Sequence, residues 1–167
     1  MSLSTRLSIM MFLQFFVWGS WMVTLGTYLL QNLHFSGLEI GMIYATNSIA
    51  ATITPVLMGV LADKYFRGDR IMVVLHLLGG GCLIAVYFTT SFWPFYGLML
   101  AYIFCYVPTF SLSTSLCFYH LKNPSRDNPR IRVWNTIAWV VASVLISWLA
   151  IETEATPLLI AGIGSII

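Results

Sequence analysis

The chain has 167 residues, of which 59% belong to the hydrophobic set and only 8% are charged, and its net charge is +2. A soluble domain carries roughly 25% charged residues, so these few charges exclude a water-soluble globule. The small charge excess also excludes a nucleic-acid-binding surface. Long uncharged runs separate the charges, and about 20 apolar residues are enough for one spanning helix. The composition therefore indicates a membrane protein with several spans.

The sequence does not favour an enzyme. No nucleophile stands beside a general base, no pair of carboxylates suggests acid–base chemistry, and no set of metal ligands is present. The three cysteines, Cys82, Cys105 and Cys117, lie inside apolar runs without a CxxC spacing or paired histidines. We expect no metal site and no bound cofactor.

Apolar runs divide the chain into six expected helices. The first run is too long for a signal-peptide core of about 7–15 residues. The uncharged run 71–121 is too long for one helix, and we expect it to turn near Pro94, which suits a helix start. The segment 121–130 is expected to be a loop. The expected spans are 7–30, 39–62, 71–89, 95–120, 132–151 and 157–167.

The last expected span, 157–167, is shorter than the others. As a helix it reaches about 16 Å, whereas a hydrocarbon core is about 30 Å thick. We therefore expect the sequence to stop inside a helix and to be a fragment of a longer protein.

The charges predict the orientation of the bundle. All eight Lys and Arg residues lie at the amino terminus, between the second and third spans, or between the fourth and fifth, with Arg132 at the first residue of the fifth. Glu39, Glu152 and Glu154 mark the opposite side, which has no Lys or Arg. By the positive-inside rule the amino terminus is cytoplasmic.

Polar and aromatic residues follow one side of the first expected helix. Gln14 and Trp18 share this side with Trp21 and Tyr28, whereas Gly19 lies on another. This pattern predicts one face that lines a cavity and another that packs closely. Gln14 and Trp18 are the candidate substrate contacts, because a buried amide is costly without a partner. The alternative for the aromatic residues is packing against lipid or neighbouring helices.

The fourth expected helix repeats this pattern. Pro108 interrupts its backbone ladder, which a spanning helix tolerates when its neighbours satisfy the freed carbonyl. The candidate substrate contacts here are Tyr106 and Thr109. Their stripe consists of Tyr102, Tyr106, Thr109, Ser113 and His120.

The third expected helix contains one titratable residue and a run of glycines. His76 titrates near neutral pH if it is accessible, and the alternative is a hydrogen-bonded packing residue. Gly79-Gly80-Gly81 predicts a close helix contact, because neither a strand nor a Lys-Ser or Lys-Thr pair flanks it.

The fifth expected helix carries the sharpest signal. Arg132, Thr136, Trp139 and Ser143 follow i, i+4, i+7 and i+11 spacing and form one stripe. A guanidinium and a hydroxyl donate hydrogen bonds, and a large ring stacks on a flat solute. The alternative for Arg132 is an interfacial residue that snorkels to the cytoplasm. No Asp or Glu lies in the interior of any span, so a proton-coupling carboxylate, if the carrier has one, is expected beyond Ile167.

The segment Gly59-Val60-Leu61-Ala62-Asp63-Lys64, between the second and third spans, resembles the G-x-L-A-D-R/K signature of the major facilitator superfamily. The closing part, Arg67-Gly68-Asp69-Arg70, departs from the usual Gly-Arg-Arg/Lys. The resemblance implies that Gly59 permits a close helix approach and that Asp63 is part of a conformational latch holding the outward-open state.

Further motifs resemble the bacterial nucleoside:proton symporters of that superfamily. They are Phe12-Leu13-Gln14-Phe15, Trp18-Gly19-Ser20-Trp21 and Leu25-Gly26 in the first helix, Tyr106-Val107-Pro108-Thr109 in the fourth, and Ile131-Arg132-Val133-Trp134-Asn135-Thr136 opening the fifth. The resemblance implies an all-α membrane protein: the amino-terminal six-helix half of a twelve-helix carrier, cut within its sixth helix. It also implies that Arg132, Thr136 and Trp139 contact the nucleoside, although the aromatic is more usually Phe in that family.

The leading hypothesis is proton-coupled nucleoside uptake by alternating access across the bacterial inner membrane. The proton is the coupling ion, and the expected partners are a nucleoside, the lipid bilayer and a missing carboxy-terminal half. The alternatives are a carrier of another polar solute, such as a sugar, and a membrane subunit that does not transport.

Overall fold

The computed structural model describes residues 3–64, 68–121 and 123–167, without the side chains of residues 55–64 and 124. Every regular element in this part of the chain is helical. The helices are α1 Leu3–Met22, α2 Leu25–Gln31, α3 Gly37–Lys64, α4 Gly68–Tyr87, α5 Phe92–His120, α6 Pro124–Trp148 and α7 Thr156–Ile166.

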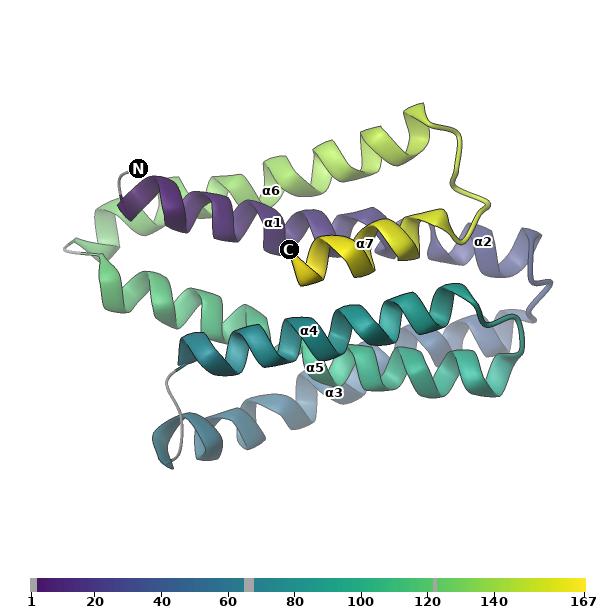
Figure 1. The fold of residues 1–167 in the computed structure, drawn as a ribbon, viewed down its shortest axis with the longest axis horizontal. Coiled ribbons are helices and arrows are strands. Elements are labelled where there is room, and N and C mark those ends of the chain that lie inside the picture. The colour runs from purple at the N-terminus through teal and green to yellow at the C-terminus, as the bar shows by residue number, and fades with distance from the viewer. Residues whose placement is uncertain (1–2, 65–67, 122) are drawn as a thin grey trace.

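The helices form two groups, with α1, α2, α6 and α7 in one and α3, α4 and α5 in the other (Figure 1). Helix α1 packs mainly against α6 and α7, while α5 packs against α3 and α4, and the contact of α4 with α7 joins the groups. The amino terminus and the α3–α4 and α5–α6 connections lie at one end of the bundle. The sequence places Arg6, Arg70 and Arg126 at this end, and Glu152 lies at the other.

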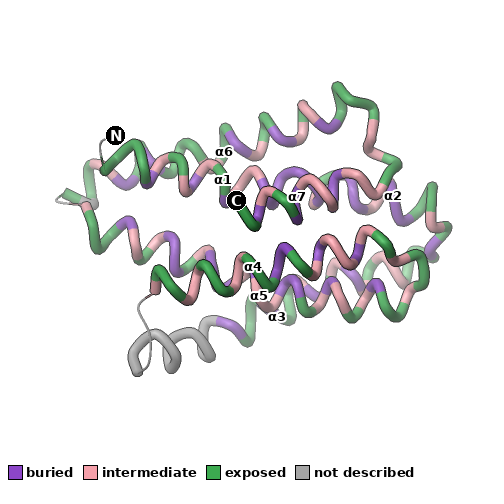
Figure 2. The backbone as a smooth tube through the Cα atoms, viewed as in Figure 1, coloured by how far each residue is buried: buried purple, intermediate pink, exposed green. Residues whose placement is uncertain are grey.

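The outer faces of the bundle are apolar. Within the described residues, four helical segments are long and apolar enough to cross a membrane: Leu3–Gln31, Gly68–Tyr87, Phe92–His120 and Ser125–Trp148. Leu78 on α4 and Val144 on α6 are 57% and 61% exposed, and exposed residues follow the outer sides of these helices in Figure 2. Such faces suit contact with lipid rather than water.

The expected first helix, 7–30, is interrupted. It ends as α1 at Met22 and resumes as α2 at Leu25. Tyr44 of α3 occupies the break: its hydroxyl accepts a hydrogen bond from the Gly26 amide at 2.9 Å and donates one to the Met22 carbonyl at 3.2 Å. A break inside a membrane is tolerated when a neighbouring helix satisfies the freed backbone groups.

The expectation of a loop over 121–130 is wrong, because α6 already begins at Pro124. Proline suits the first turn of a helix, where no intrahelical donor is needed, and Asp127 in that turn favours the positive end of the helix dipole. Pro129 lies inside α6. The polar composition of this segment therefore marks a helix that continues beyond the apolar span.

Glycines set the spacing of α4 and α7. A Cβ atom added at Gly80 would lie 2.8 Å from the Gly162 carbonyl oxygen, and one added at Gly162 would lie 3.1 Å from the Gly80 oxygen. The predicted close contact at the glycine run is confirmed for Gly80. It is wrong for Gly81, where an added Cβ would meet nothing within 4 Å.

Candidate functional site

The candidate site is built on an aromatic cluster between α1 and α5, which consists of Phe15, Trp18, Trp21, Tyr102, Tyr106 and Phe110. Trp18 stacks on Tyr106 with ring centroids 5.5 Å apart and meets Phe110 edge to face at 5.4 Å. Trp18, Trp21, Tyr102 and Tyr106 are buried, whereas Phe15 and Phe110 are half-buried at its rim.

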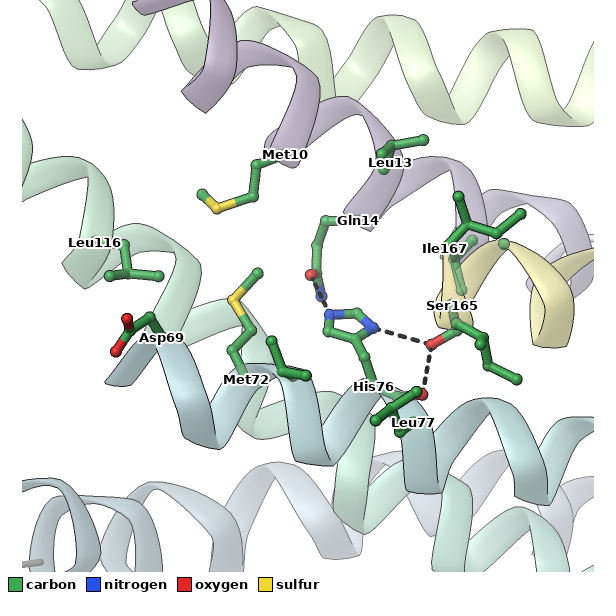
Figure 3. Close-up of a pocket in the computed structure, with 14 residues that line it drawn as sticks. Met10, Leu13, Gln14, Asp69, Met72, His76, Leu77, Leu116, Ser165 and Ile167 are labelled. Carbon is green, nitrogen blue, oxygen red and sulfur yellow. Dashed lines mark hydrogen bonds between the residues drawn. The ribbon is translucent and has the colours of Figure 1, made fainter. Parts of the chain in front are cut away.

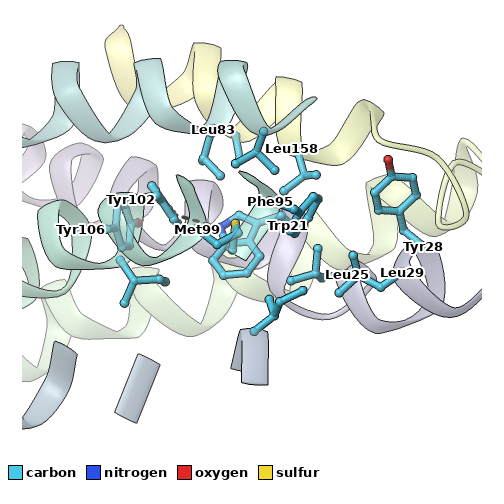
Figure 4. Close-up of a cluster of buried hydrophobic side chains, with 14 of the residues drawn as sticks. Trp21, Leu25, Tyr28, Leu29, Leu83, Phe95, Met99, Tyr102, Tyr106 and Leu158 are labelled. Carbon is cyan, nitrogen blue, oxygen red and sulfur yellow. Dashed lines mark hydrogen bonds between the residues drawn. The ribbon is translucent and has the colours of Figure 1, made fainter. Parts of the chain in front are cut away.

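The inner end of this cluster continues into the core of the bundle (Figure 4). The Trp21 indole N–H donates to the Tyr102 hydroxyl at 3.0 Å, and both rings pack beside Phe95, Met99 and Leu83. A buried indole needs such a partner for its N–H. The expected stripe on the first helix is therefore partly a packing face, which was the alternative for Trp21.

A polar layer lies behind the aromatic cluster. Gln14 of α1 is 2% exposed, and its Nε2 donates to the Thr109 Oγ1 of α5 at 2.5 Å. Thr109 in turn donates to the Tyr106 backbone carbonyl at 2.5 Å, and the Tyr106 hydroxyl donates to the backbone carbonyl of Gln14. The structure thus brings together four predicted site residues, namely Gln14, Trp18, Tyr106 and Thr109.

Gln14 also connects this layer to α4 and α7 (Figure 3). His76 Nε2 lies 2.9 Å from Gln14 Oε1, and His76 Nδ1 lies 2.9 Å from the Ser165 hydroxyl. These groups line a pocket of about 380 Å³ between α1, α4, α5 and α7, with Asp69 toward its other end. Sequence reasoning found His76 but missed Ser165, whose only signal was a polar residue inside an apolar run.

The residues of the predicted stripe on α6 differ in solvent exposure. Arg132 and Thr136 are exposed, whereas Trp139 is half-buried and packs against the buried core that includes Trp18. Gly19 of α1 allows this approach, because a Cβ added there would lie 3.0 Å from the Trp139 Cα. The predicted close-packing side of the first helix therefore faces α6, and Trp139 forms an edge of the candidate site.

The predicted conformational latch lies outside what the structure describes. Gly59 and Asp63 fall in the last turns of α3, among residues whose side-chain surroundings are not described.

The chemistry available on α1, α5 and α6 is stacking combined with hydrogen bonding. Indole and phenol rings offer flat faces, and Arg132 and Thr136 offer donors that face outward from α6. Across the described residues, no group of three or more His, Cys, Asp and Glu side chains is placed to hold a metal ion. The arrangement suits an uncharged ligand with a flat ring and several oxygens.

The chain is similar in sequence and fold to known proteins. The family model described as nucleoside H⁺ symporter matches residues 1–167. The xanthosine permease of Escherichia coli is 38% identical over 100% of this chain, and the nucleoside permease NupG of the same organism is 35% identical over 88% of it. Two crystal structures of the nucleoside transporter NupG superpose with TM-scores of 0.95 and 0.96 at 33% and 34% identity, over 98% and 99% of this chain.

These relatives are considerably longer. The chain spans 41% of the xanthosine permease, 36% of the permease NupG and 42% of the NupG structures. The relatives are transporters, in agreement with the prediction that the chain is not an enzyme. Both the sequence match along the whole chain and the helical membrane fold lead to one conclusion: the chain belongs to the nucleoside H⁺ symporter family.

Proposed function

We propose that this chain is part of a carrier that moves nucleosides together with protons across a membrane. The observation that carries the proposal is the match of the nucleoside H⁺ symporter family to residues 1–167. The seven helices of the described residues belong to one half of that carrier, since the chain corresponds to about two fifths of its longer relatives. A second helical half completes the path, and the two halves alternate access to the substrate.

The nucleoside is held by residues of α1, α5 and α6. Trp18 and Tyr106 already stack on each other, so their cluster offers a wall on which a base can stack. Arg132 and Thr136 donate hydrogen bonds to base or ribose oxygens, and Trp139 closes the edge. The helical spacing of the α6 stripe and the exposure of Arg132 and Thr136 support these roles.

Gln14 and Thr109 have a different part in this proposal. Their side chains already bond to each other, and Gln14 also faces His76. They reach a substrate only by exchanging these partners. In the present conformation they hold the aromatic cluster in place from behind.

The membrane is the bacterial inner membrane, and the amino terminus is cytoplasmic. The arginines gathered at one end of the bundle support this orientation. The coupling ion is the proton, and no other cofactor is needed. Gly59 and Asp63, matched by resemblance alone, form the conformational latch.

Uptake of radiolabelled solutes by bacteria that lack their own nucleoside transporters tests this proposal. Cells expressing the intact protein should accumulate uridine, adenosine or xanthosine, and a proton uncoupler should abolish the accumulation. Arg132→Ala should lower uptake at least tenfold. Arg130→Ala, which removes another exposed arginine of the same helix, is the matched control and should not. Accumulation of a labelled sugar without any nucleoside would instead support the alternative carrier.

A further inference from the structure

His76 joins three helices through its two ring nitrogens. From α4 it reaches Gln14 of α1 through Nε2 and Ser165 of α7 through Nδ1, each at 2.9 Å. The Ser165 hydroxyl also lies 3.1 Å from the backbone carbonyl oxygen of His76. Figure 3 shows the ring between these two partners. Both ring nitrogens of this half-buried imidazole therefore have hydrogen-bond partners on other helices.

The hydrogen-bond chain fixes which nitrogen of His76 can titrate. Thr109 uses its single hydroxyl hydrogen on the Tyr106 carbonyl, so Thr109 must accept from Gln14 Nε2. The side-chain oxygen Oε1 of Gln14 therefore faces His76 and accepts a hydrogen bond from Nε2–H. Because Nε2 carries a hydrogen for this reason, a further proton can bind only at Nδ1.

The Ser165 hydroxyl satisfies Nδ1 in either protonation state. When Nδ1 is bare, Ser165 donates to it at 2.9 Å. When Nδ1 is protonated, it donates to the Ser165 oxygen, and the hydroxyl hydrogen turns to the His76 carbonyl at 3.1 Å. Rotation of one hydroxyl is then the only change that the network requires. The network therefore lets Nδ1 bind a proton without the loss of a hydrogen bond.

The surroundings permit the charged form. Asp69 lines the same pocket from the solvent-exposed start of α4. Tyr106 of α5 contributes its ring, 5.7 Å from the imidazole and edge to face. The neighbours on α1 and α7, Gln14 and Ser165, do not titrate. In the described part of the pocket lining no Lys or Arg opposes a positive charge.

We propose that His76 is a proton-binding residue of the transport cycle, with Nδ1 as the atom that takes up and releases the proton. This inference rests on the proposed proton-coupled function and assigns a residue to it. The proton leaves a hydronium ion, a bond forms between it and Nδ1, and water remains; the reverse step returns it to solvent. Protonation converts two neutral hydrogen bonds into charge-assisted ones.

The change at His76 reaches the candidate nucleoside site through one residue. The Gln14 side chain accepts from His76 and donates to Thr109, and the Tyr106 hydroxyl donates to the backbone carbonyl of Gln14. Tyr106 stacks on Trp18. Stronger bonds from an imidazolium hold α1, α4 and α7 together and fix the wall on which the base stacks. Proton binding and nucleoside binding then favour each other, as linkage requires.

The direct test is ¹⁵N NMR of the intact protein labelled at histidine, with the His76 signals assigned by their loss in His76→Gln. Between about pH 5 and 8, the range in which an imidazole serves as a switch, Nδ1 should change from bare to protonated as the pH falls, while Nε2 stays protonated. An Nδ1 that does not change over this range overturns the inference. The measurement needs no nucleoside, so its outcome does not depend on the proposed substrate.

Nucleoside binding by the same preparations supplies the second readout. Wild-type affinity should vary with pH, and His76→Gln, which keeps a donor toward Gln14 but takes up no proton, should bind with little variation. His120→Gln, at an exposed histidine, is the matched control and should behave as wild type. Wild-type pH dependence in His76→Gln contradicts the inference. Failure of the wild type to bind any nucleoside contradicts the proposed function instead.

Ser165→Ala keeps the inference testable if His76→Gln does not fold. It removes the acceptor of Nδ1–H, and the charge-assisted bond lost by the imidazolium is about twice as strong as the neutral bond lost by the imidazole. The midpoint of the Nδ1 titration should therefore move to lower pH by roughly one unit. An unchanged midpoint counts against the assignment of Nδ1.

Discussion

Gln14 of α1 and Thr109 of α5, 95 residues apart in the chain, are joined side chain to side chain at 2.5 Å in the interior of the bundle. Both are almost fully buried, at 2% and 0% exposure. A buried amide without partners loses its hydration and gains nothing in return. This contact therefore fixes the position of α1 along its axis relative to α5. It thereby also fixes the stacking of Trp18 on Tyr106.

Replacing Thr109 tests this contact. Thr109→Val keeps the shape of the side chain but leaves the Gln14 amide without an acceptor, which should destabilise the protein by about 1–3 kcal/mol. Thr109→Ser keeps the hydroxyl and should cost much less. Thermal unfolding of the purified protein in detergent measures both, and equal melting temperatures for the two variants would contradict a role for this hydrogen bond.

The approach of α4 to α7 is a second point of sensitivity. Gly80→Ala places a methyl group 2.8 Å from the Gly162 carbonyl oxygen, so the helices must separate at a cost of about 1–3 kcal/mol. Gly81→Ala is the matched control, since its Cβ would meet nothing within 4 Å. The two variants should differ clearly in thermal stability in the same detergent. A Gly80→Ala protein as stable as Gly81→Ala would show that this crossing adapts freely.

The proposed cytoplasmic amino terminus predicts which end of the bundle is accessible from outside the cell. In a background free of other cysteines, Ser125→Cys at the start of α6 should resist a membrane-impermeant maleimide in intact cells. Thr153→Cys, exposed between α6 and α7, should react, because it lies at the end without Lys or Arg. Permeabilised cells should label at both positions, and labelling of Ser125→Cys in intact cells would reverse the topology.

Hydropathy and charge predict much of this fold because the bilayer restricts the choices. Uncharged runs long enough to span must be helical, as their backbone groups find no water. The same reasoning failed at α6, where a polar first turn continues a spanning helix and composition alone suggested a loop from residue 121 to 130. It also failed at Met22, because the break there depends on the Tyr44 hydroxyl of another helix.

The candidate site was predictable only one helix at a time. Helical spacing placed Gln14 with Trp18 and Tyr106 with Thr109, and the structure joins these pairs. Spacing cannot pair residues on different helices, however. The contacts of His76 with Gln14 and Ser165 arise from tertiary packing, so they could not be predicted from the periodicity of any one helix.

The central proposal is that a nucleoside binds to Arg132, Thr136 and Trp139 of the stripe on α6. Its most direct test is nucleoside affinity of the purified intact protein, measured by titration calorimetry with uridine and adenosine, with folding verified separately. Losing a hydrogen bond from a charged donor costs about 1.5–3 kcal/mol, so Arg132→Ala should weaken binding roughly 10–150-fold. Thr136→Ala should weaken it less, and Trp139→Phe should have a mild effect because a ring remains. Unchanged affinity in folded Arg132→Ala and Thr136→Ala proteins would contradict this site and leave Arg132 as an interfacial residue.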